Sequence, residues 1–414
     1  MPPECADIVI IGAGAIGLCT ALRLRAEGRE VLLVDRDEAG SGASRGNAGV
    51  LANYECVPLG TPSVLKALPR LLFDAKSPLS ISVTALPQLA PWLLRFARES
   101  LGGRAHQHAV TLAALLGNSL SAYAPLIDLA NAHSLLRRDG ALHLFRRQRD
   151  VEDAAWHREL RHELGIRQEL LDRGELESLE PALPAEYTRG ILFPEAAHLT
   201  DPFELMQRLK HAFVAKGGRM VRAEITTLRH DKNMIAVSGE DFRVRARTAV
   251  VSSGAWSASL CRQLGDRIPL ETERGYHVEF PMSKPLLTRP VCPVDLGFYL
   301  TPMAGRLRAA GTVELSRIHR AANPRRLRLI EQSTRRLFAG LPEARSHWLG
   351  FRPSLPDSLP VIGRSPRARN VIYAFGHGHL GVTLAAETAR VVSDLIVDDR
   401  HQGELAALSP ARFR

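Results

Sequence analysis

The sequence predicts a mixed α/β protein of two domains, in which a parallel-sheet domain is interrupted by a domain built on antiparallel strands. Three observations support this fold class. A strand–helix–strand pattern fills residues 7–35, buried strands of the same type return at 249–251 and 371–375, and alternating apolar and polar residues lie between them at 276–280 and 298–301. The chain has 414 residues. This length suits two or three units of about 150 residues each.

A glycine-rich turn stands inside the first strand–helix–strand unit. Residues 8–11 are a β-branched run typical of a strand buried on both faces, and the sequence GAGAIG follows at once. In such a turn Gly12 permits the tight bend, Gly14 lets the backbone approach a pyrophosphate, and Gly17 lets the helix pack closely on the strand. The second strand ends at Asp35, whose carboxylate is placed to accept hydrogen bonds from a ribose. The unit therefore predicts a dinucleotide at the helix N-terminus.

The segment after the second strand bears on which dinucleotide binds. Residues 41–49 read SGASRGNAG, a run too rich in small, turn-prone residues to form a regular helix or strand. It is either a plain surface loop or a segment that lays backbone N–H groups along a cofactor extending from the pyrophosphate. The second interpretation favours FAD. Asp35 itself excludes neither FAD nor a nicotinamide cofactor.

Composition excludes several classes of protein. Apolar residues make up 45% and charged residues 24%, which excludes a disordered, collagen-like or polytopic membrane protein. The net charge is +10, but the arginines are scattered and carry no nucleic-acid-binding signature, so no nucleic-acid partner is expected. Five cysteines, never in a CxxC, argue against a disulfide framework and a metal site and indicate a reducing, cytoplasmic compartment. The N-terminus lacks signal-peptide features, and no uninterrupted apolar run approaches the roughly 18 residues of a spanning helix.

A Leu- and Pro-rich segment at residues 58–101 has two interpretations. It contains an apolar set at helical spacing: Leu86, Leu89, Trp92, Leu93 and Phe96. This face either covers the protein core or docks on the inner surface of the cytoplasmic membrane. Covering the core is the more common use of such a face.

The later part of the chain sets the expected domain boundaries. A strand is expected around residues 222–227, and residues 350–363 are expected to form an irregular loop because they contain several prolines. The cofactor domain is assigned to residues 1–60, 195–265 and 345–414, and the substrate domain to residues 61–194 and 266–344.

Eight motifs, in order, resemble those of a known family. They are IIGAGAIG, VLLVDR, SGASRGNAGVLA, VVSSGAW, ERGYH, YLTPMAGRLRAAGT, GFRPSLPDSLPVIG and GHGHLGVTLA. The chain resembles FAD-dependent oxidoreductases of the D-amino-acid oxidase and glycine oxidase type and, among them, the bacterial D-amino acid dehydrogenases. The resemblance implies a Rossmann-like FAD domain of the glutathione-reductase type with an inserted antiparallel-sheet substrate domain.

The resemblance also implies a set of cofactor-binding positions, from the pyrophosphate and adenosine to the flavin ring. These are Gly12, Gly14, Ala15, Ile16, Gly17, Asp35, Arg36, Ser44, Asn47, Ala48, Gly49, Ile225, Gly254, Gly378, His379, Leu380, Gly381, Val382 and Thr383.

The same resemblance implies the substrate-binding residues. Arg352 matches the arginine that binds the substrate carboxylate, and Tyr299 matches a tyrosine that contacts the same carboxylate. Tyr54 and Tyr276 are further candidates, and His377 and His379 are candidates for the amine end. Each of these has a purely structural alternative, such as a strand tyrosine packed on its sheet. The implied reaction transfers hydride from Cα to flavin and gives an imine, then a 2-oxo acid, without a dedicated acid–base pair.

Departures from the family pattern refine these expectations. No cysteine follows Cys292, so the FAD is expected to be non-covalent, and no lysine follows Lys284, which favours a quinone or carrier protein over oxygen as electron acceptor. The motif GHGHLG replaces the usual GHGTLG, which leaves D-hydroxyproline and D-proline open as substrates beside other D-amino acids. Glycine or sarcosine oxidation, a nicotinamide-dependent dehydrogenase and a flavin-holding subunit of a membrane-associated assembly remain alternatives.

Overall fold

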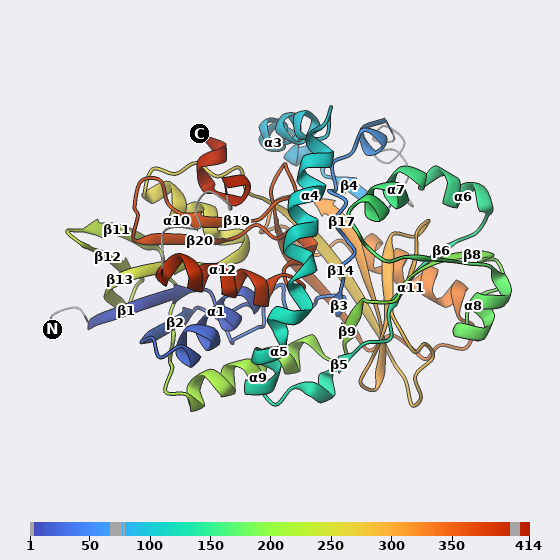
Figure 1. Ribbon diagram of the computed structural model, residues 1–414, viewed down its shortest axis with the longest axis horizontal. Coiled ribbons are helices and arrows are strands. Elements are labelled where there is room, and N and C mark those ends of the chain that lie inside the picture. Colours follow the sequence, from blue (N-terminus) through green and yellow to red (C-terminus); the bar gives the residue numbers. More distant parts are fainter. Residues whose placement is uncertain (1–3, 67–76, 78, 398–405) are drawn as a thin grey trace.

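The computed structural model describes residues 4–66, 77, 79–397 and 406–414. An eight-stranded sheet forms one half of the described protein (Figure 1). Its strands are β1 (Glu4–Ile11), β2 (Val31–Asp35), β10 (Arg219–Arg222), β11 (Thr227–Asp231), β12 (Met234–Ser238), β13 (Arg243–Val251), β19 (Val361–Arg364) and β20 (Val371–Phe375).

The middle of this sheet is parallel. The order is β10-β2-β1-β13-β12-β11, and β20 also pairs with β13 and carries β19 beyond it. The strands β10, β2, β1, β13 and β20 run parallel, whereas β11, β12 and β19 pair antiparallel. In β1, Ile8 and Ile10 face one hydrophobic cluster, while Val9 and Ile11 face another. The β-branched run is therefore buried on both faces, as predicted.

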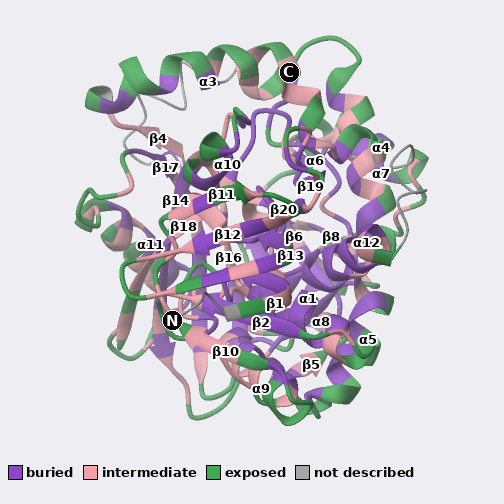
Figure 2. Ribbon diagram, turned by 90° about the vertical axis from the view of Figure 1, so that its left-hand side faces the viewer, coloured by how far each residue is buried: buried purple, intermediate pink, exposed green. Residues whose placement is uncertain are grey.

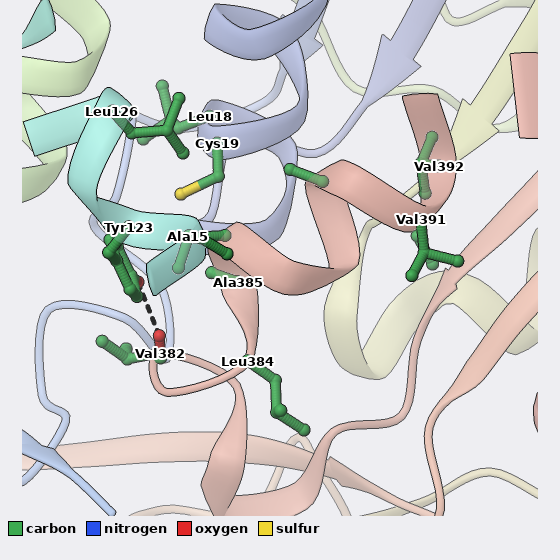
Figure 3. Packing of buried hydrophobic residues seen from close by; sticks show 14 of the residues in the cluster. Ala15, Leu18, Cys19, Tyr123, Leu126, Val382, Leu384, Ala385, Val391 and Val392 are labelled. Atoms are coloured by element: carbon green, nitrogen blue, oxygen red, sulfur yellow. Dashed lines mark hydrogen bonds between the residues drawn. The ribbon is translucent and has the colours of Figure 1, made fainter. Parts of the chain in front are cut away.

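Helices cover one face of the parallel strands. The α-helices include α1 (Ala15–Ala26), α3 (Leu86–Glu99), α4 (Arg104–Gly117), α5 (Ser119–Leu129), α6 (Gln148–Asp153), α7 (Ala155–Glu163), α8 (Arg173–Leu179), α9 (Pro202–Ala215), α10 (Ser257–Gln263), α11 (Pro324–Leu337) and α12 (Ala385–Val397). Helix α1 packs against both α12 and α9, and α12 packs against α5. Figure 3 shows this core, in which Leu18 lies beside Leu126 and Ala15 lies beside Ala385. The Tyr123 hydroxyl donates a hydrogen bond to the Val382 carbonyl oxygen at 2.5 Å.

A nine-stranded sheet forms the other half. Its order is β18-β14-β17-β16-β15-β6-β8-β7, with β4 beside β17. All pairs are antiparallel except β15 with β6 and β17 with β4. The bounds are β4 (Leu79–Ile81), β6 (Ala141–Phe145), β7 (Glu169–Leu171), β8 (Arg189–Phe193), β14 (Glu271–Pro281), β15 (Val291–Pro293), β16 (Phe298–Met303), β17 (Arg306–Leu315) and β18 (Ser346–Ser354). A small sheet of β3 (Val50–Leu51), β9 (Ala197–Leu199) and β5 (Leu136–Arg137) adjoins them.

Two local expectations are wrong. The strand expected around 222–227 is a connection, because β10 ends at Arg222 and β11 begins at Thr227. The irregular loop expected at 350–363 contains the end of β18 and the start of β19. Strand β18 tolerates Pro353 because it is an edge strand with only β14 beside it. Residues 345–414 were assigned to the cofactor domain from the sequence. Residues 346–354 instead form β18, which pairs with β14 of the nine-stranded sheet.

The segment 58–101 packs mainly as a cover, although residues 67–76 and 78 lie outside the described chain. Helix α3 continues through Pro91 and buries Leu89 and Trp92 beside Leu315. Its outer side is exposed in Figure 2, and Leu94 is 73% exposed. The core-covering interpretation thus accounts for one face of the helix.

One helical stretch of the described chain, Arg104–Leu129, is long and apolar enough to cross a membrane by length and composition alone. It combines α4 and α5, and its best 18-residue window has a mean hydropathy of 1.4. In that window 44% of the residues are buried inside the protein. Leu112, Leu116 and Leu126 from this stretch belong to the core around α1 and α12, as expected of a core helix.

Candidate functional site

A cavity of about 750 Å³ runs from the glycine turn after β1 to the face of the nine-stranded sheet. Most of the sequence-predicted site residues line it: Gly12, Gly14, Ala15, Ile16, Asp35, Arg36, Ser44, Asn47, Ala48, Ile225, Gly254, Tyr299, Arg352, Gly378, His379, Leu380, Gly381, Val382 and Thr383. Four predicted residues are not among its lining residues, namely Gly17, Gly49, Tyr54 and Tyr276.

The glycine turn has the close approaches that its sequence predicts. Gly12 has φ +108°, and a Cβ there would lie 2.5 Å from the Ser252 carbonyl oxygen. A Cβ on Gly17 would lie 1.8 Å from the Gly12 carbonyl oxygen, so Gly17 acts by letting α1 pack on the turn rather than by lining the cavity. Asp35 accepts a hydrogen bond from the Ala13 N–H at 2.5 Å, and the Ala15 N–H at the start of α1 donates to Ser44 Oγ at 2.9 Å. The carboxylate at the end of β2 thus also holds the turn in place.

The end of the cavity beyond the glycine turn is built around the Trp256 ring. The Arg36 guanidinium lies 3.9 Å above the centre of the Trp256 ring, and Ile225 and Gly254 line the cavity beside them. Arg36 also pairs with Asp37 at 3.1 Å. Flat apolar and cationic groups at this end suit a purine base and its ribose.

The loop at 44–49 is held by side chains of the nine-stranded sheet, which the sequence analysis missed. Buried Arg308 donates through Nη1 to the carbonyl oxygens of Arg45 at 3.1 Å and Asn47 at 2.6 Å. His277 Nδ1 lies 3.2 Å from the Gly46 carbonyl oxygen between them. Three successive carbonyl groups are therefore anchored on the substrate sheet, while Asn47 and Ala48 line the cavity.

Two neighbours further restrain this loop. A Cβ on Gly46 would lie 1.9 Å from Trp348 Cε3, so only glycine allows the indole to pack there. Gly49 has φ +79° and donates its N–H to Asn47 Oδ1 at 2.7 Å, which places Gly49 behind the loop rather than in the cavity wall.

The loop before α12 brings two neutral histidines to the site. Burial lowers the pKa of His377 to about 3, and His377 Nε2 lies 2.8 Å from Thr388 Oγ1. Burial together with the Arg352 charge lowers the pKa of His379 to about 4. Thr383 Oγ1 accepts a hydrogen bond from the Ala52 N–H at 3.2 Å and so ties this loop to the N-terminal part of the chain. The His379 imidazole is uncharged at neutral pH.

Arg352 on β18 reaches across the neighbouring strand. A Cβ on Gly275 of β14 would lie 2.4 Å from Arg352 Cζ, which shows that the guanidinium lies directly over that glycine. Arg352 Nη1 donates to the Thr312 carbonyl oxygen on β17 at 2.9 Å. Burial lowers the pKa of Arg352 although Glu273 raises it, and burial raises the pKa of Glu273 although Arg352 lowers it. The cavity therefore contains a half-buried guanidinium with further N–H groups to donate, a geometry that matches a carboxylate.

Tyr299 on β16 belongs to a chain of hydrogen bonds. Its hydroxyl lies 2.8 Å from the Tyr54 hydroxyl and 2.9 Å from His143 Nε2. Tyr54 stacks on Phe193 at 3.9 Å between ring centres and supports Tyr299 from outside the cavity wall. Burial lowers the pKa of His143 to about 3, aided by the charge of Arg161. His143 was missed in the sequence; it shares a face of β6 with Phe145, and both line the cavity.

Tyr276 is the candidate that the structure places elsewhere. Successive residues of a strand point to opposite faces, so Tyr276 turns away where its neighbour Gly275 faces the cavity. The Tyr276 hydroxyl donates to Glu314 and accepts a hydrogen bond from the Asn323 N–H at 3.1 Å. Its role in the described structure is to hold the start of α11.

Comparison with known proteins adds the family. A family model described as DAO, FAD dependent oxidoreductase, matches residues 7–395. The chain belongs to this family. It is 34% identical over 423 residues to a D-amino-acid oxidase of Bradyrhizobium diazoefficiens, covering 99% of this chain and 100% of that one. It is also 32% identical over 406 residues to a D-amino acid dehydrogenase of Paramagnetospirillum magneticum, covering 94% of each.

Solved structures share the DAO fold. Glycine oxidase from Geobacillus kaustophilus matches with a TM-score of 0.75 and 22% identity over 98% of both chains. L-Proline dehydrogenase from P. horikoshii matches with a TM-score of 0.75 and 19% identity, covering 99% of this chain and 98% of that one. At these identities the likeness supports the Rossmann-like FAD domain with its substrate domain, and nothing finer.

The cavity fits the FAD that the DAO family uses. Bare backbone at Gly12 and Gly14, the start of α1 and the Asp35 carboxylate suit the pyrophosphate and ribose. The loop at 44–48 and the loop at 378–383 line the stretch between that end and Arg352. This DAO family member is thus an FAD-dependent oxidoreductase, and most of its predicted cofactor-binding residues line one cavity.

Proposed function

We propose that this enzyme oxidises the Cα–N bond of a D-amino or imino acid and passes the electrons to a quinone or a carrier protein. The observation that carries the proposal is the Arg352 guanidinium, which lies over Gly275 inside the cofactor cavity. A fixed guanidinium beside a flavin site selects a substrate with a free carboxylate. The names of the two relatives, D-amino-acid oxidase and D-amino acid dehydrogenase, support the D-amino acid class.

The proposed roles follow from position. Arg352 binds the substrate carboxylate, and the Thr312 carbonyl group fixes the guanidinium by accepting its Nη1–H. The Tyr299 hydroxyl, supported by Tyr54, contacts the same carboxylate. Uncharged His379 borders the amine end without repelling an ammonium group.

The chemistry needs an oxidant and a positioned substrate. When bound, FAD would supply the oxidant: loss of a hydride from Cα and a proton from nitrogen leaves an imine, which water converts to a 2-oxo acid and ammonia if the amine is primary. The residues around Arg352 hold Cα in place and exclude water from it. We propose that the FAD is non-covalent, so acid precipitation should release all of it into the supernatant.

An anaerobic absorbance titration tests the proposal. The purified protein is titrated with D- and L-amino acids, D-proline, cis-4-hydroxy-D-proline, glycine and sarcosine. Bleaching of the flavin band by D-compounds supports the function. Bleaching only by L-amino acids, glycine or sarcosine, or by none of the compounds, refutes it and leaves the family assignment intact.

Membrane contact through α3 is a separate proposal. Leu94 and Leu101, 73% and 54% exposed, project from the outer side of this region beside Arg98. Co-sedimentation with anionic vesicles at low salt that disappears at high salt supports contact on the cytoplasmic face of a membrane. Absence of binding at low salt refutes it.

A further inference from the structure

Beyond Tyr299 the cavity continues into a section that the proposed reaction does not use. We call this the distal section, and its acidic and basic lining residues are Glu55, His143, His157, Arg158 and Arg161. The α7 residues among them share one helical face with the preceding Ala154, at spacings of three and four. One face of α7 therefore forms a wall of the distal section.

An ion pair is fixed at the centre of the distal section. Arg161 Nη2 lies 3.2 Å from Glu55 Oε1, and Arg161 Nε donates to the Tyr54 carbonyl oxygen at 3.1 Å. The guanidinium also lies 5.2 Å above the Phe193 ring that stacks on Tyr54. The Arg161 side chain is 6% exposed. Glu55 Oε2 and Arg161 Nη1 make no hydrogen bond to another described residue.

The remaining groups of the distal section are uncharged or positive. Burial and the Arg161 charge lower the pKa of His157 to about 4, and His143 is neutral for the same reasons. Glu55 and Arg161 balance each other's charge. Half-buried Arg158 adds a positive charge that disfavours a cationic ligand. An anionic group placed against the Glu55–Arg161 pair would bring an acceptor oxygen against the Glu55 carboxylate, which is itself an acceptor. A neutral group that both donates and accepts hydrogen bonds finds an acceptor in Glu55 and a donor in Arg161.

We propose that the distal section is the side-chain subsite, and that it selects D-amino or imino acids with a neutral hydrogen-bonding group, a hydroxyl or a carboxamide. This inference rests on the proposed function. Such a group donates to Glu55 and accepts from Arg161 or an imidazole, whereas an alkyl side chain of the same shape displaces water from both partners and replaces none of its hydrogen bonds.

The test uses three substrates of nearly equal shape: D-asparagine, D-leucine and D-aspartate. The holoenzyme should show a kcat/KM for D-asparagine about ten- to a hundredfold above those of the other two. Longer and cyclic pairs extend the test, with D-glutamine against D-methionine and cis-4-hydroxy-D-proline against D-proline. Equal or greater kcat/KM for the apolar or anionic member in all three sets overturns the subsite.

Two variants locate the effect. Glu55→Leu combined with Arg161→Met removes both charges together and should bring the asparagine-to-leucine ratio close to one, with the flavin still bound. Glu55→Gln keeps the hydrogen bond but removes the negative charge, so kcat/KM for D-aspartate relative to D-asparagine should rise about tenfold. An unchanged ratio in either folded variant overturns the assignment. The matched control is Arg167→Gln with Glu169→Gln, an exposed pair at 2.7 Å outside the cavity.

The two proposals fail in different ways. If no D-compound reduces the flavin of the unaltered protein, the proposed function fails. If D-compounds reduce it but side-chain polarity makes no difference, only the subsite fails.

Discussion

Replacement of Gly275 by alanine tests how the substrate arginine is held. An added Cβ would lie 2.4 Å from Cζ and Nη2 of Arg352 and 2.8 Å from Nε. Because nonbonded carbon atoms approach to about 3.5 Å, the guanidinium would have to move by about 1 Å. A displacement of 1 Å in a positioning group can reduce the rate about a hundredfold. We therefore expect Gly275→Ala to lower kcat/KM about a hundredfold.

The assay separates this effect from loss of cofactor or fold. Gly275 and the glycine turn lie at different ends of the cavity, so the flavin dissociation constant should stay within about twofold while substrate binding weakens. Thermal unfolding should report an overpacking cost of about 1–3 kcal/mol. The control is Gly117→Ala, because a Cβ at that position meets no atom within 4 Å. Substrate constants that match those of the control would show that Arg352 does not bind the carboxylate from this position.

Three further outcomes are expected. Arg308→Met removes the donor to two carbonyls of the cofactor loop and should weaken flavin binding at least tenfold in a fluorescence titration of apoprotein; unaltered affinity would contradict the anchoring role. Tyr276→Phe removes the hydroxyl donor to Glu314 Oε2 and should cost about 1–3 kcal/mol in denaturant unfolding with KM unchanged, whereas a raised KM would return Tyr276 to the site. Burial alone raises the pKa of Glu279, but Arg308, Ser346 and Arg306 outweigh it and lower the pKa to about 2. Because this folded-state pKa lies below the ordinary value of 4.5, the ionised Glu279 stabilises the folded protein above about pH 4.5, and this stabilisation is lost as the pH falls towards 2. Glu279→Gln should therefore reduce the fall in the free energy of unfolding between pH 4.5 and pH 2.

The cofactor half of the site was predictable because its signals are local. Gly12, Gly14 and Asp35 act within one strand–helix–strand unit, where glycine spacing and strand ends are visible in the chain. The buried run of β1 likewise indicates its place in the sheet. These residues line the cavity as the pattern requires.

The substrate half depends on pairings between distant strands, which periodicity does not reveal. His143 reaches the Tyr299 hydroxyl only because β6 and β16 both pair with β15, and Arg161 meets Glu55 across 106 positions. Tyr276 was named as a substrate-site candidate, but in β14 the residue that faces the cavity is its neighbour Gly275. The register irregularity between Arg274 and Tyr276 in the pairing with β17 makes the alternation of β14 harder to follow from sequence.

The anchoring of three successive loop carbonyls on the substrate sheet has a consequence for the life of the protein in the cell. In the proposed site this loop meets the flavin and is anchored on the nine-stranded sheet, so flavin binding would stabilise both halves of the described protein. At a free flavin concentration a hundredfold above its dissociation constant, this linkage is worth about 2.7 kcal/mol against unfolding. Cells short of flavin should then degrade the chain and lower its abundance, instead of storing it as an intact apoprotein.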